Sequence, residues 1–158
     1  MKNAVEGAEI RRMAAADVDQ VLAIAESLPE APRWPRSAYL NALNPESTPR
    51  RIALVAFRTP PDAILGFAVA SLLPPQAELE TIAVAREGQR QGLGKRLFEA
   101  LAVELKAASV EELLLEVRAS NQTAQVFYRA LGFGQTGLRP GYYTEPIEDA
   151  VLMQLTVA

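Results

Sequence analysis

The sequence contains no cysteine and no histidine, and each absence narrows the chemistry open to it. Without cysteine there is no disulfide, no thiol nucleophile and no thiolate metal site. Without histidine, the usual general base and the commonest metal ligand are both missing. Any acid–base chemistry must therefore come from Glu, Asp, Tyr, Lys, a chain terminus or water.

Long apolar runs and an excess of basic charge are missing as well. The longest apolar run, at 64–73, is broken by Gly66 and Ser71 and is too short to cross a bilayer. The N-terminus, MKNAVEGAEIRRM, has no apolar signal core, so we expect no export, no membrane partner and a cytoplasmic location. Sixteen basic and 19 acidic side chains give a formal net charge of −3, which argues against binding nucleic acid by neutralising its phosphates.

Signs of disorder and of internal repetition are also absent. Of the 158 residues, 49% are hydrophobic, and the 11 Pro and 9 Gly lie far below a disordered or fibrous composition. No repeat, low-complexity tract or linker divides the chain. We expect a single domain over residues 1–158.

What is present is a pattern of short strands and amphipathic helices. We predict strands at 10–13, 51–58, 63–72, 78–84, 113–117 and 150–156, helices at 17–28, 37–43, 92–108 and 121–131, and a turn at 59–62. Asp17 is expected to cap the first helix, and 134–141 is interpreted as loop or strand. An antiparallel meander up to residue 84 is followed by a parallel pair joined by a crossover helix. The predicted fold class is therefore mixed α/β (α+β).

A glycine-rich segment joins the strand at 78–84 to the helix at 92–108, and its sequence is Gln89-Arg90-Gln91-Gly92-Leu93-Gly94-Lys95. Such a turn directs unpaired backbone N–H groups and the positive end of the helix dipole at one place, where a pyrophosphate would fit. The P-loop pattern fails at Gln89 and Arg96, and the dinucleotide-binding pattern fails at Leu97. From the spacing alone, a tight turn without a ligand is equally compatible.

The remaining pattern, Gln89-x-x-Gly92-x-Gly94 after Ile82-Ala83-Val84, resembles the GNAT superfamily of N-acetyltransferases, whose signature is Gln/Arg-x-x-Gly-x-Gly/Ala. The similarity extends over most of the chain and is greatest to the ribosomal-protein alanine N-acetyltransferase (RimI-like) branch. The further segments that carry it are Ile10-Arg11-Arg12-Met13, Leu115-Glu116-Val117-Arg118-Ala119-Ser120-Asn121, the stretch from Asn121 to Phe133, Gly141-Tyr142-Tyr143 and Glu148-Asp149-Ala150-Val151-Leu152-Met153.

The resemblance implies a GNAT-type fold, a mixed and largely antiparallel sheet with a splayed parallel strand pair, flanked by helices. It also implies acetyl-CoA as the acetyl donor and no metal. The pyrophosphate would lie on the glycine-rich turn, and the pantetheine arm along the strand that ends at Val84. The implied cofactor-binding residues are Ile82, Ala83, Val84, Gln89, Arg90, Gln91, Gly92, Leu93, Gly94, Lys95, Asn121 and Tyr128. Asn121 is equally suited to cap the helix that follows it.

Glu116 is the first candidate for the general base. It interrupts the apolar strand at 113–117, where an unpaired buried charge is expensive and partial burial makes a carboxylate a better base. The residues alone favour a position of Glu116 at the edge or rim of the sheet, where its carboxylate would pair with Arg118 or face solvent. By resemblance Glu116 is the base, because the RimI-like branch uses a Glu at the matching position.

Glu80 is the rival base, since other branches of the superfamily place theirs on the strand before the glycine-rich turn. Strict alternation would put Glu78, Glu80, Ile82 and Val84 on one face of that strand, so that Glu80 would face the site. Glu116 is preferred, and Glu80 and water alone stay open as alternatives.

Tyr128 shares a helical stripe with Ala124, Phe127 and Leu131, and periodicity alone favours a core tyrosine with one hydrogen bond. By resemblance it is the general acid that protonates the departing sulfur of CoA. Because no cysteine can carry the acyl group, direct attack of the amine in a ternary complex is the remaining simple mechanism. The oxyanion would then meet a backbone N–H at or near Val84, where the strand of the family is bulged.

Aromatic residues of two loops are the implied substrate-binding groups, namely Trp34 in a proline-rich segment and the pair Tyr142 and Tyr143. An apolar cluster beneath the proline-rich segment is an equal alternative for them. The implied function is acetyl transfer to a primary amine, most readily the N-terminal α-amine of a protein such as a ribosomal protein. A small-molecule amine, a lysine, or a CoA-binding module without catalysis are the alternatives. Both a monomer and a homodimer remain open.

Overall fold

The computed structural model describes residues 7–59 and 62–157, so Pro60 and Pro61 of the predicted turn lie outside the described residues. Its strands are β1 (Glu9–Arg12), β2 (Arg51–Arg58), β3 (Ala63–Leu73), β4 (Gln76–Val84), β5 (Glu112–Arg118), β6 (Gly134–Tyr143) and β7 (Glu148–Thr156). Its helices are α1 (Val18–Ser27), α2 (Arg36–Ala42), α3 (Leu93–Ala107) and α4 (Gln122–Ala130), with the 3₁₀ turns η1 (Ala15–Asp17) and η2 (Arg86–Gly88). Within the described ranges, none of these helices combines the length and the apolar character that crossing a membrane requires.

The seven strands form one sheet in the order β1-β2-β3-β4-β5-β7-β6. Each neighbouring pair is antiparallel except β4 and β5, which run parallel and are joined through α3. The predicted mixed, largely antiparallel sheet is therefore confirmed. The stretch at 134–141, interpreted as loop or strand, is part of β6, which pairs with β7 at the edge of the sheet.

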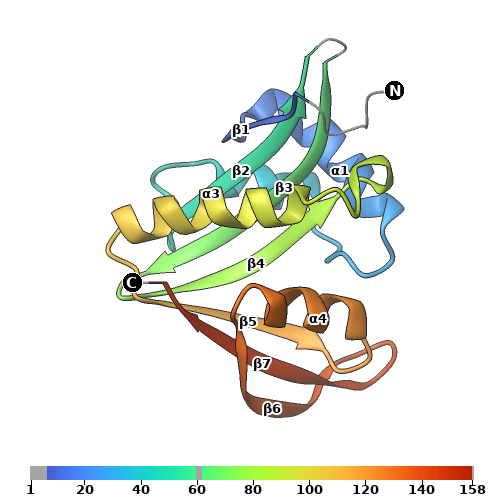
Figure 1. The fold of residues 1–158 in the computed structure, drawn as a ribbon, viewed down its shortest axis with the longest axis vertical. Coiled ribbons are helices and arrows are strands. Elements are labelled where there is room, and N and C mark those ends of the chain that lie inside the picture. Colours follow the sequence, from blue (N-terminus) through green and yellow to red (C-terminus); the bar gives the residue numbers. More distant parts are fainter. Residues whose placement is uncertain (1–6, 60–61, 158) are drawn as a thin grey trace.

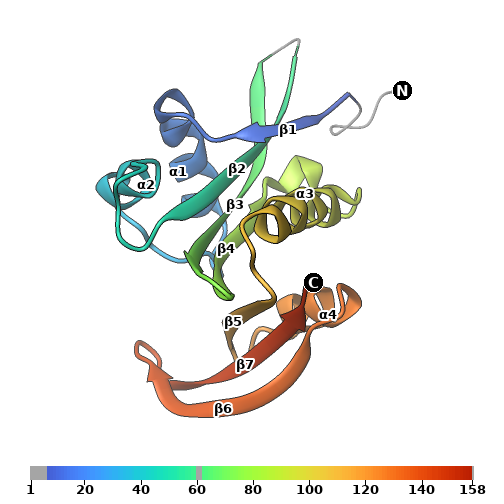
Figure 2. The ribbon, with the colours of Figure 1, turned by 90° about the vertical axis from the view of Figure 1, so that its left-hand side faces the viewer.

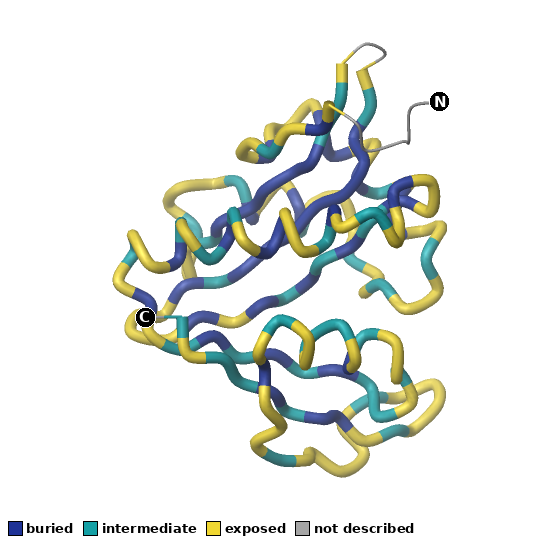
Figure 3. Tube along the Cα trace, viewed as in Figure 1, coloured by how far each residue is buried: buried dark blue, intermediate teal, exposed yellow. Residues whose placement is uncertain are grey.

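Helices cover both faces of the sheet (Figures 1 and 2). On one face, α3 packs Leu93, Leu97, Leu101 and Leu105 into the larger core cluster, and α4 lies on the same side. On the other face, α1 and α2 pack over β2 and β3 in a second cluster. The buried segments of Figure 3 follow these two layers, whereas most of β6 is exposed. We call the two sides of the sheet the α3/α4 face and the α1/α2 face.

The parallel pair β4 and β5 stays together for only three residue pairs. Gln76 pairs with Glu112, and the last pair is Glu78 with Leu114. Beyond it, β4 continues beside β3 and β5 continues beside β7, so the two strands separate toward their C-terminal ends (Figure 1). The predicted splayed pair is therefore present, and the gap opens between the end of β4 and the end of β5.

A β-bulge interrupts the alternation of β4 at Glu80. Val69 of β3 pairs with Thr81 and Ala70 pairs with Leu79, which leaves Glu80 without a partner. Leu79 and Ile82, three residues apart, therefore pack against the same core cluster. The prediction that Glu78, Glu80, Ile82 and Val84 share one face is wrong, because the extra residue reverses the alternation. The bulge also lies at Glu80, whereas we expected it at or near Val84.

Asp17 caps a different element from the one predicted. Its carboxylate accepts a hydrogen bond from the backbone N–H of Ala14 at 2.7 Å and closes the 3₁₀ turn η1, while it makes no capping bond to α1. Arg11 binds the same carboxylate at 2.7 and 2.9 Å, and this pair lowers the pKa of Asp17. The side chain therefore fixes the path of the chain from β1 into α1.

Gly66 allows β3, β4 and α3 to approach closely, which yields a test of the packing. A Cβ atom at Gly66 would lie 2.8 Å from the carbonyl oxygen of Ala83 and 3.1 Å from Leu97 Cδ1. We expect Gly66→Ala to lower the free energy of unfolding by about 1–3 kcal/mol in urea denaturation. Gly134→Ala is the control, because no atom lies within 4 Å of the added Cβ. Equal stability of the two variants would contradict this packing.

Candidate active site

The glycine-rich turn leads directly into α3, as predicted. Gly92 is the residue before the helix and has φ +79°, a conformation that favours glycine, and Arg90 also has a positive φ of +62°. Gly92 has no side chain with which to cap the helix, and the N–H groups of its first turn, Leu93 to Lys95, have no intrahelical acceptor. Nothing lies within 4 Å of a Cβ built on Gly92. The turn thus presents N–H donors and open space together, which fits an anionic phosphate group.

Two glutamine side chains hold this turn in place. Gln89 Nε2 donates to the carbonyl of Val84 at 2.9 Å, and Gln91 Nε2 donates to the carbonyl of Glu87 at 3.0 Å. The first of these bonds ties the turn to the end of β4, where Ile82, Ala83 and Val84 were predicted to lie along the cofactor. Arg90 and Lys95 are exposed beside the turn and add positive charge to it.

The helix α4 packs against the beginning of α3. A Cβ at Gly94 would lie 3.2 Å from the Phe127 ring, so glycine at this position favours the close approach of the two helices. Asn121 Oδ1 accepts the backbone N–H of Ala124 at 3.1 Å, which confirms that Asn121 caps α4. Gln125, which the sequence analysis missed, is buried and donates to the carbonyls of Arg118 and Ala119 at the end of β5. Gln125 therefore fixes α4 to the strand that carries Glu116.

Tyr128 lies on the α3/α4 face, half-buried between aromatic rings. Its ring centre is 5.5 Å from that of Phe127 and 5.6 Å from that of Phe133. Burial raises the pKa of Tyr128 to about 12, so the hydroxyl keeps its proton throughout the neutral range. The single hydrogen bond expected of a core tyrosine is not found among the described residues. Tyr128 is therefore a protonated donor whose hydroxyl is not engaged by the described protein atoms.

Glu116 projects from β5 to the α1/α2 face, opposite the buried Leu115 and Val117. Its carboxylate binds Arg139 of β6 at 3.0 Å and interacts electrostatically with Tyr142. The expected pairing with Arg118 is wrong, because Arg118 is 3.2 Å from Glu148 instead. Arg139 was missed in the sequence because its partner lies on another strand, 23 residues away.

The predicted tyrosine pair is part of the same group of side chains. The rings of Tyr142 and Tyr143 lie 5.0 Å apart, with the Arg139 guanidinium 4.7 Å from the Tyr142 ring and the Arg118 guanidinium 4.4 Å from the Tyr143 ring. The neighbouring carboxylate of Glu116 raises the pKa of Tyr142, and burial raises that of Tyr143 to about 12. The structure thus brings Glu116 together with both tyrosines.

Glu80, the rival base, is held by an ion pair on the α1/α2 face. Arg51 of β2 binds its carboxylate at 2.7 Å, and both side chains are mostly buried. Glu78, two residues earlier, is electrostatically coupled to Glu116. Glu116, Glu80 and Glu78 therefore belong to one charged surface, whereas Tyr128 and the glycine-rich turn belong to the α3/α4 side. Between these two sides, β4 and β5 are no longer paired.

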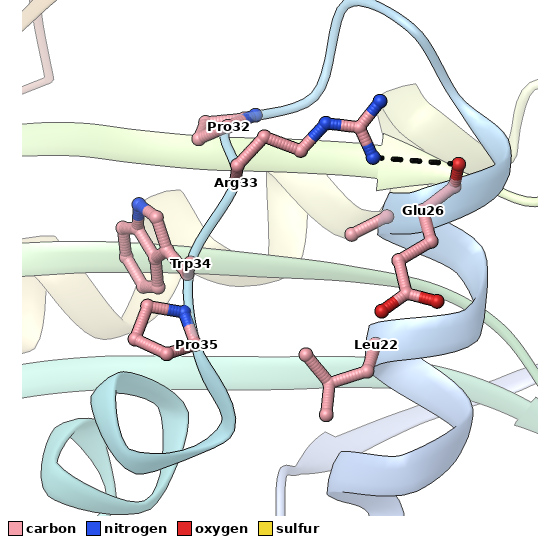
Figure 4. A pocket seen from close by; sticks show the side chains of 7 residues that line it. Leu22, Glu26, Pro32, Arg33, Trp34 and Pro35 are labelled. Atoms are coloured by element: carbon pink, nitrogen blue, oxygen red, sulfur yellow. Dashed lines mark hydrogen bonds between the residues drawn. The ribbon is translucent and has the colours of Figure 1, made fainter.

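Trp34 lies apart from this group, in a pocket of about 440 Å³ between α1 and the proline-rich segment (Figure 4). Its ring contacts Tyr39 at 5.1 Å, and the pocket is lined by Leu22, Ala25, Glu26, Pro32, Arg33, Trp34 and Pro35. In the described part of the chain, no ring contact joins Trp34 to Tyr142 or Tyr143. The role of Trp34 in binding an acceptor stays a prediction.

Comparison with known proteins identifies the family. The model of the Acetyltransferase (GNAT) family matches residues 18–133. The chain belongs to this family. A Bacillus subtilis protein, provisionally assigned as ribosomal protein bS18-alanine N-acetyltransferase, is 33% identical over 151 residues, which are 95% of this chain and 96% of that protein. The motif-based resemblance to this branch is confirmed.

A sequence match and a crystal structure from Escherichia coli complete the comparison. Ribosomal protein bS18-alanine N-acetyltransferase of strain K12 is 44% identical over 94 residues, and the match covers 58% of this chain and 64% of that enzyme, just under two thirds of its length. The crystal structure of the ribosomal-protein-S18-alanine N-acetyltransferase from Escherichia coli matches this GNAT chain with a TM-score of 0.82 and 31% identity, covering 96% of this chain and 94% of that one.

The raised pKa values of Tyr128 and Tyr143 predict a loss of stability in alkaline solution. Both are about 12 in the folded protein, against about 10 in an unfolded chain. As the pH rises between these values, the unfolded chain releases protons that the folded chain retains, so the free energy of unfolding falls. Urea denaturation at about pH 8 and about pH 11 should show this fall, and Tyr128→Phe should make it smaller. An identical fall in wild type and variant would contradict the burial of this phenol.

Proposed function

We propose that the protein is an acetyl-CoA-dependent N-acetyltransferase that transfers acetyl directly to the N-terminal α-amine of a protein such as a ribosomal protein. The observation that carries the proposal is the early end of the pairing between β4 and β5. The unpaired ends of the two strands lie between an uncapped helix N-terminus on the α3/α4 side and a group of carboxylate and tyrosine side chains on the α1/α2 face. The activity of the Escherichia coli relative and the one provisionally assigned to the Bacillus subtilis relative support the choice of acceptor.

The first-turn N–H groups of α3 and the residues of the glycine-rich turn fit the pyrophosphate of acetyl-CoA, which supplies the reactive acetyl thioester when it is bound. Val84 and its strand neighbours Ile82 and Ala83 orient the pantetheine arm beside the gap. Asn121 adds a side-chain amide there while its oxygen caps α4. We place the whole 158-residue sequence in one N-acetyltransferase domain that works in the cytoplasm.

Glu116 acts as the general base, directly or through a water molecule, and takes a proton from the acceptor nitrogen. An α-amine titrates near ~8, so its deprotonation costs only about 1 kcal/mol at neutral pH and a weak base suffices. Glu116 is preferred to Glu80 because its partner Arg139 is 55% exposed and can be displaced by an acceptor, whereas Arg51 beside Glu80 is 19% exposed. Tyr128 holds the proton that the leaving sulfur requires, and its raised pKa keeps that proton in place.

The function is tested by incubating the protein with acetyl-CoA and a panel of acceptors, followed by mass spectrometry of the products. Peptides with a free N-terminal alanine should be acetylated at the α-amine, and the same peptides with a blocked N-terminus but a free lysine should not. If only lysine or small amines were acetylated, the acceptor would be one of these and not a protein N-terminus. CoA binding without any turnover would indicate a binding module.

The role of Glu116 is tested by Glu116→Gln, which keeps the size of the side chain and removes the base. We expect kcat to fall by about a hundredfold or more, because a positioned base contributes a factor of that order. Glu112→Gln is the matched control on the same strand, where the carboxylate contacts Gln154 and Thr156 and not the tyrosine pair. Unchanged kcat in Glu116→Gln would shift the assignment to Glu80 or to water alone.

A further inference from the structure

The charged groups that act on Glu78 on the α1/α2 face are the carboxylates of Glu80 and Glu116 and the guanidinium groups of Arg51 and Arg139. Arg51 binds Glu80 at 2.7 Å, and Arg139 binds Glu116 at 3.0 Å. Among the described residues, neither an ion pair nor a hydrogen bond is formed by the carboxylate of Glu78. Two of the three negative charges are thus compensated by an arginine, and the charge of Glu78 is left over.

Glu78 stands at the point where the two parallel strands part. It is the last residue of β4 that pairs with β5, opposite Leu114. Glu116 lies two residues further along β5 and projects to the same face as Leu114, because side chains alternate along a strand. Glu78 on β4 and Glu116 on β5 therefore flank the beginning of the gap. The negative charge of Glu116 repels that of Glu78 and raises its pKa.

The surroundings of Glu78 favour the arrival of a cation. Partial burial raises the pKa of Glu78, and the like charges of Glu116 and Glu80 raise it further, while Arg51 and Arg139 lower it. The charge of Glu78 also contributes to the raised pKa of Tyr142 of β6. A carboxylate beside two others is repelled by their like charges, and a primary amine, which arrives at neutral pH as a positively charged ammonium group, would relieve that repulsion.

We propose that Glu78 binds the ammonium form of the acceptor amine and makes the site specific for cationic primary amines. This inference rests on the proposed function and deepens it by dividing the work between two carboxylates. Glu78 attracts and positions the charged amine at the start of the gap, and Glu116 receives the proton. Glu78 is accordingly a positioning residue, whose loss should weaken binding of the acceptor more than it slows the chemical step.

The test compares two peptides that differ only in the amine. The first has an N-terminal alanine, uncharged side chains and an amidated C-terminus, so its α-ammonium is its only charge. The second is its desamino analogue, with propionyl in place of alanyl. Calorimetric titration into protein saturated with CoA measures both affinities without turnover. We expect the wild type to prefer the amine by about tenfold or more, as for a hydrogen-bonded charge pair.

Glu78→Gln should lose most of this preference and raise the KM of the amine peptide by about tenfold, while kcat falls far less than in Glu116→Gln. Glu99→Gln is the control, since it removes the same charge from an exposed position on α3, on the opposite face of the sheet. The Glu99→Gln variant should retain the full preference for the amine peptide over its desamino analogue. At about pH 10, where the amine is neutral, the preference of the wild type should shrink.

Two results would overturn the inference: a wild type that binds both peptides equally, or a Glu78→Gln variant that keeps the full preference for the amine. Neither touches the proposed function, which fails only if the wild type acetylates no protein N-terminus. Thermal unfolding and CoA affinity of Glu78→Gln serve as checks on folding, and both should match the wild type because Glu78 is exposed and lies away from the glycine-rich turn.

Discussion

The early end of the pairing between β4 and β5 is the constraint on which the rest of the site depends. After Glu78 and Leu114 the two strands no longer share hydrogen bonds, and each is held from its other side, β4 by β3 and β5 by β7. Backbone groups along the inner edge of β4 up to Val84 therefore lack a neighbouring strand, and buried backbone groups need partners. An extended ligand that carries amide groups can supply them. The unpaired edge of β4 is thus the place where the proposal puts the chain-like arm of the cofactor.

The unpaired ends of β4 and β5 lie between the two halves of the proposed chemistry. The N-terminus of α3, with its free N–H donors, and the protonated Tyr128 lie toward the α3/α4 face. Glu116, Glu78 and the tyrosine pair lie on the α1/α2 face. Donor and acceptor can then approach from opposite sides and meet in the gap, which suits direct transfer in a ternary complex. The arginines of the second face balance most of its negative charge, and the remaining charge matches that of an incoming ammonium group.

The helix, the turn and the cap at Asn121 were predictable from the sequence, whereas the strand register and the partners of the charged side chains were not. The helix at 92–108, the turn before it and the cap at Asn121 follow from periodicity, glycine and hydrogen bonding within a few residues. The bulge at Glu80 has no signal in the strand itself, because it depends on the register with β3, and it reversed the predicted faces of Ile82 and Val84. The partners of Glu116 and Glu80 were equally hidden, since Arg139 and Arg51 reach them from other strands.

Hydrogen–deuterium exchange with and without CoA tests the central claim most directly, because the first-turn amides of α3 lack an acceptor in the free protein and should exchange rapidly. The account predicts that CoA slows exchange at residues 89–95 and along the end of β4 at 82–84, while the pocket at 32–35 is unaffected. Protection confined to that pocket, or no protection at the glycine-rich turn at saturating CoA, would contradict it.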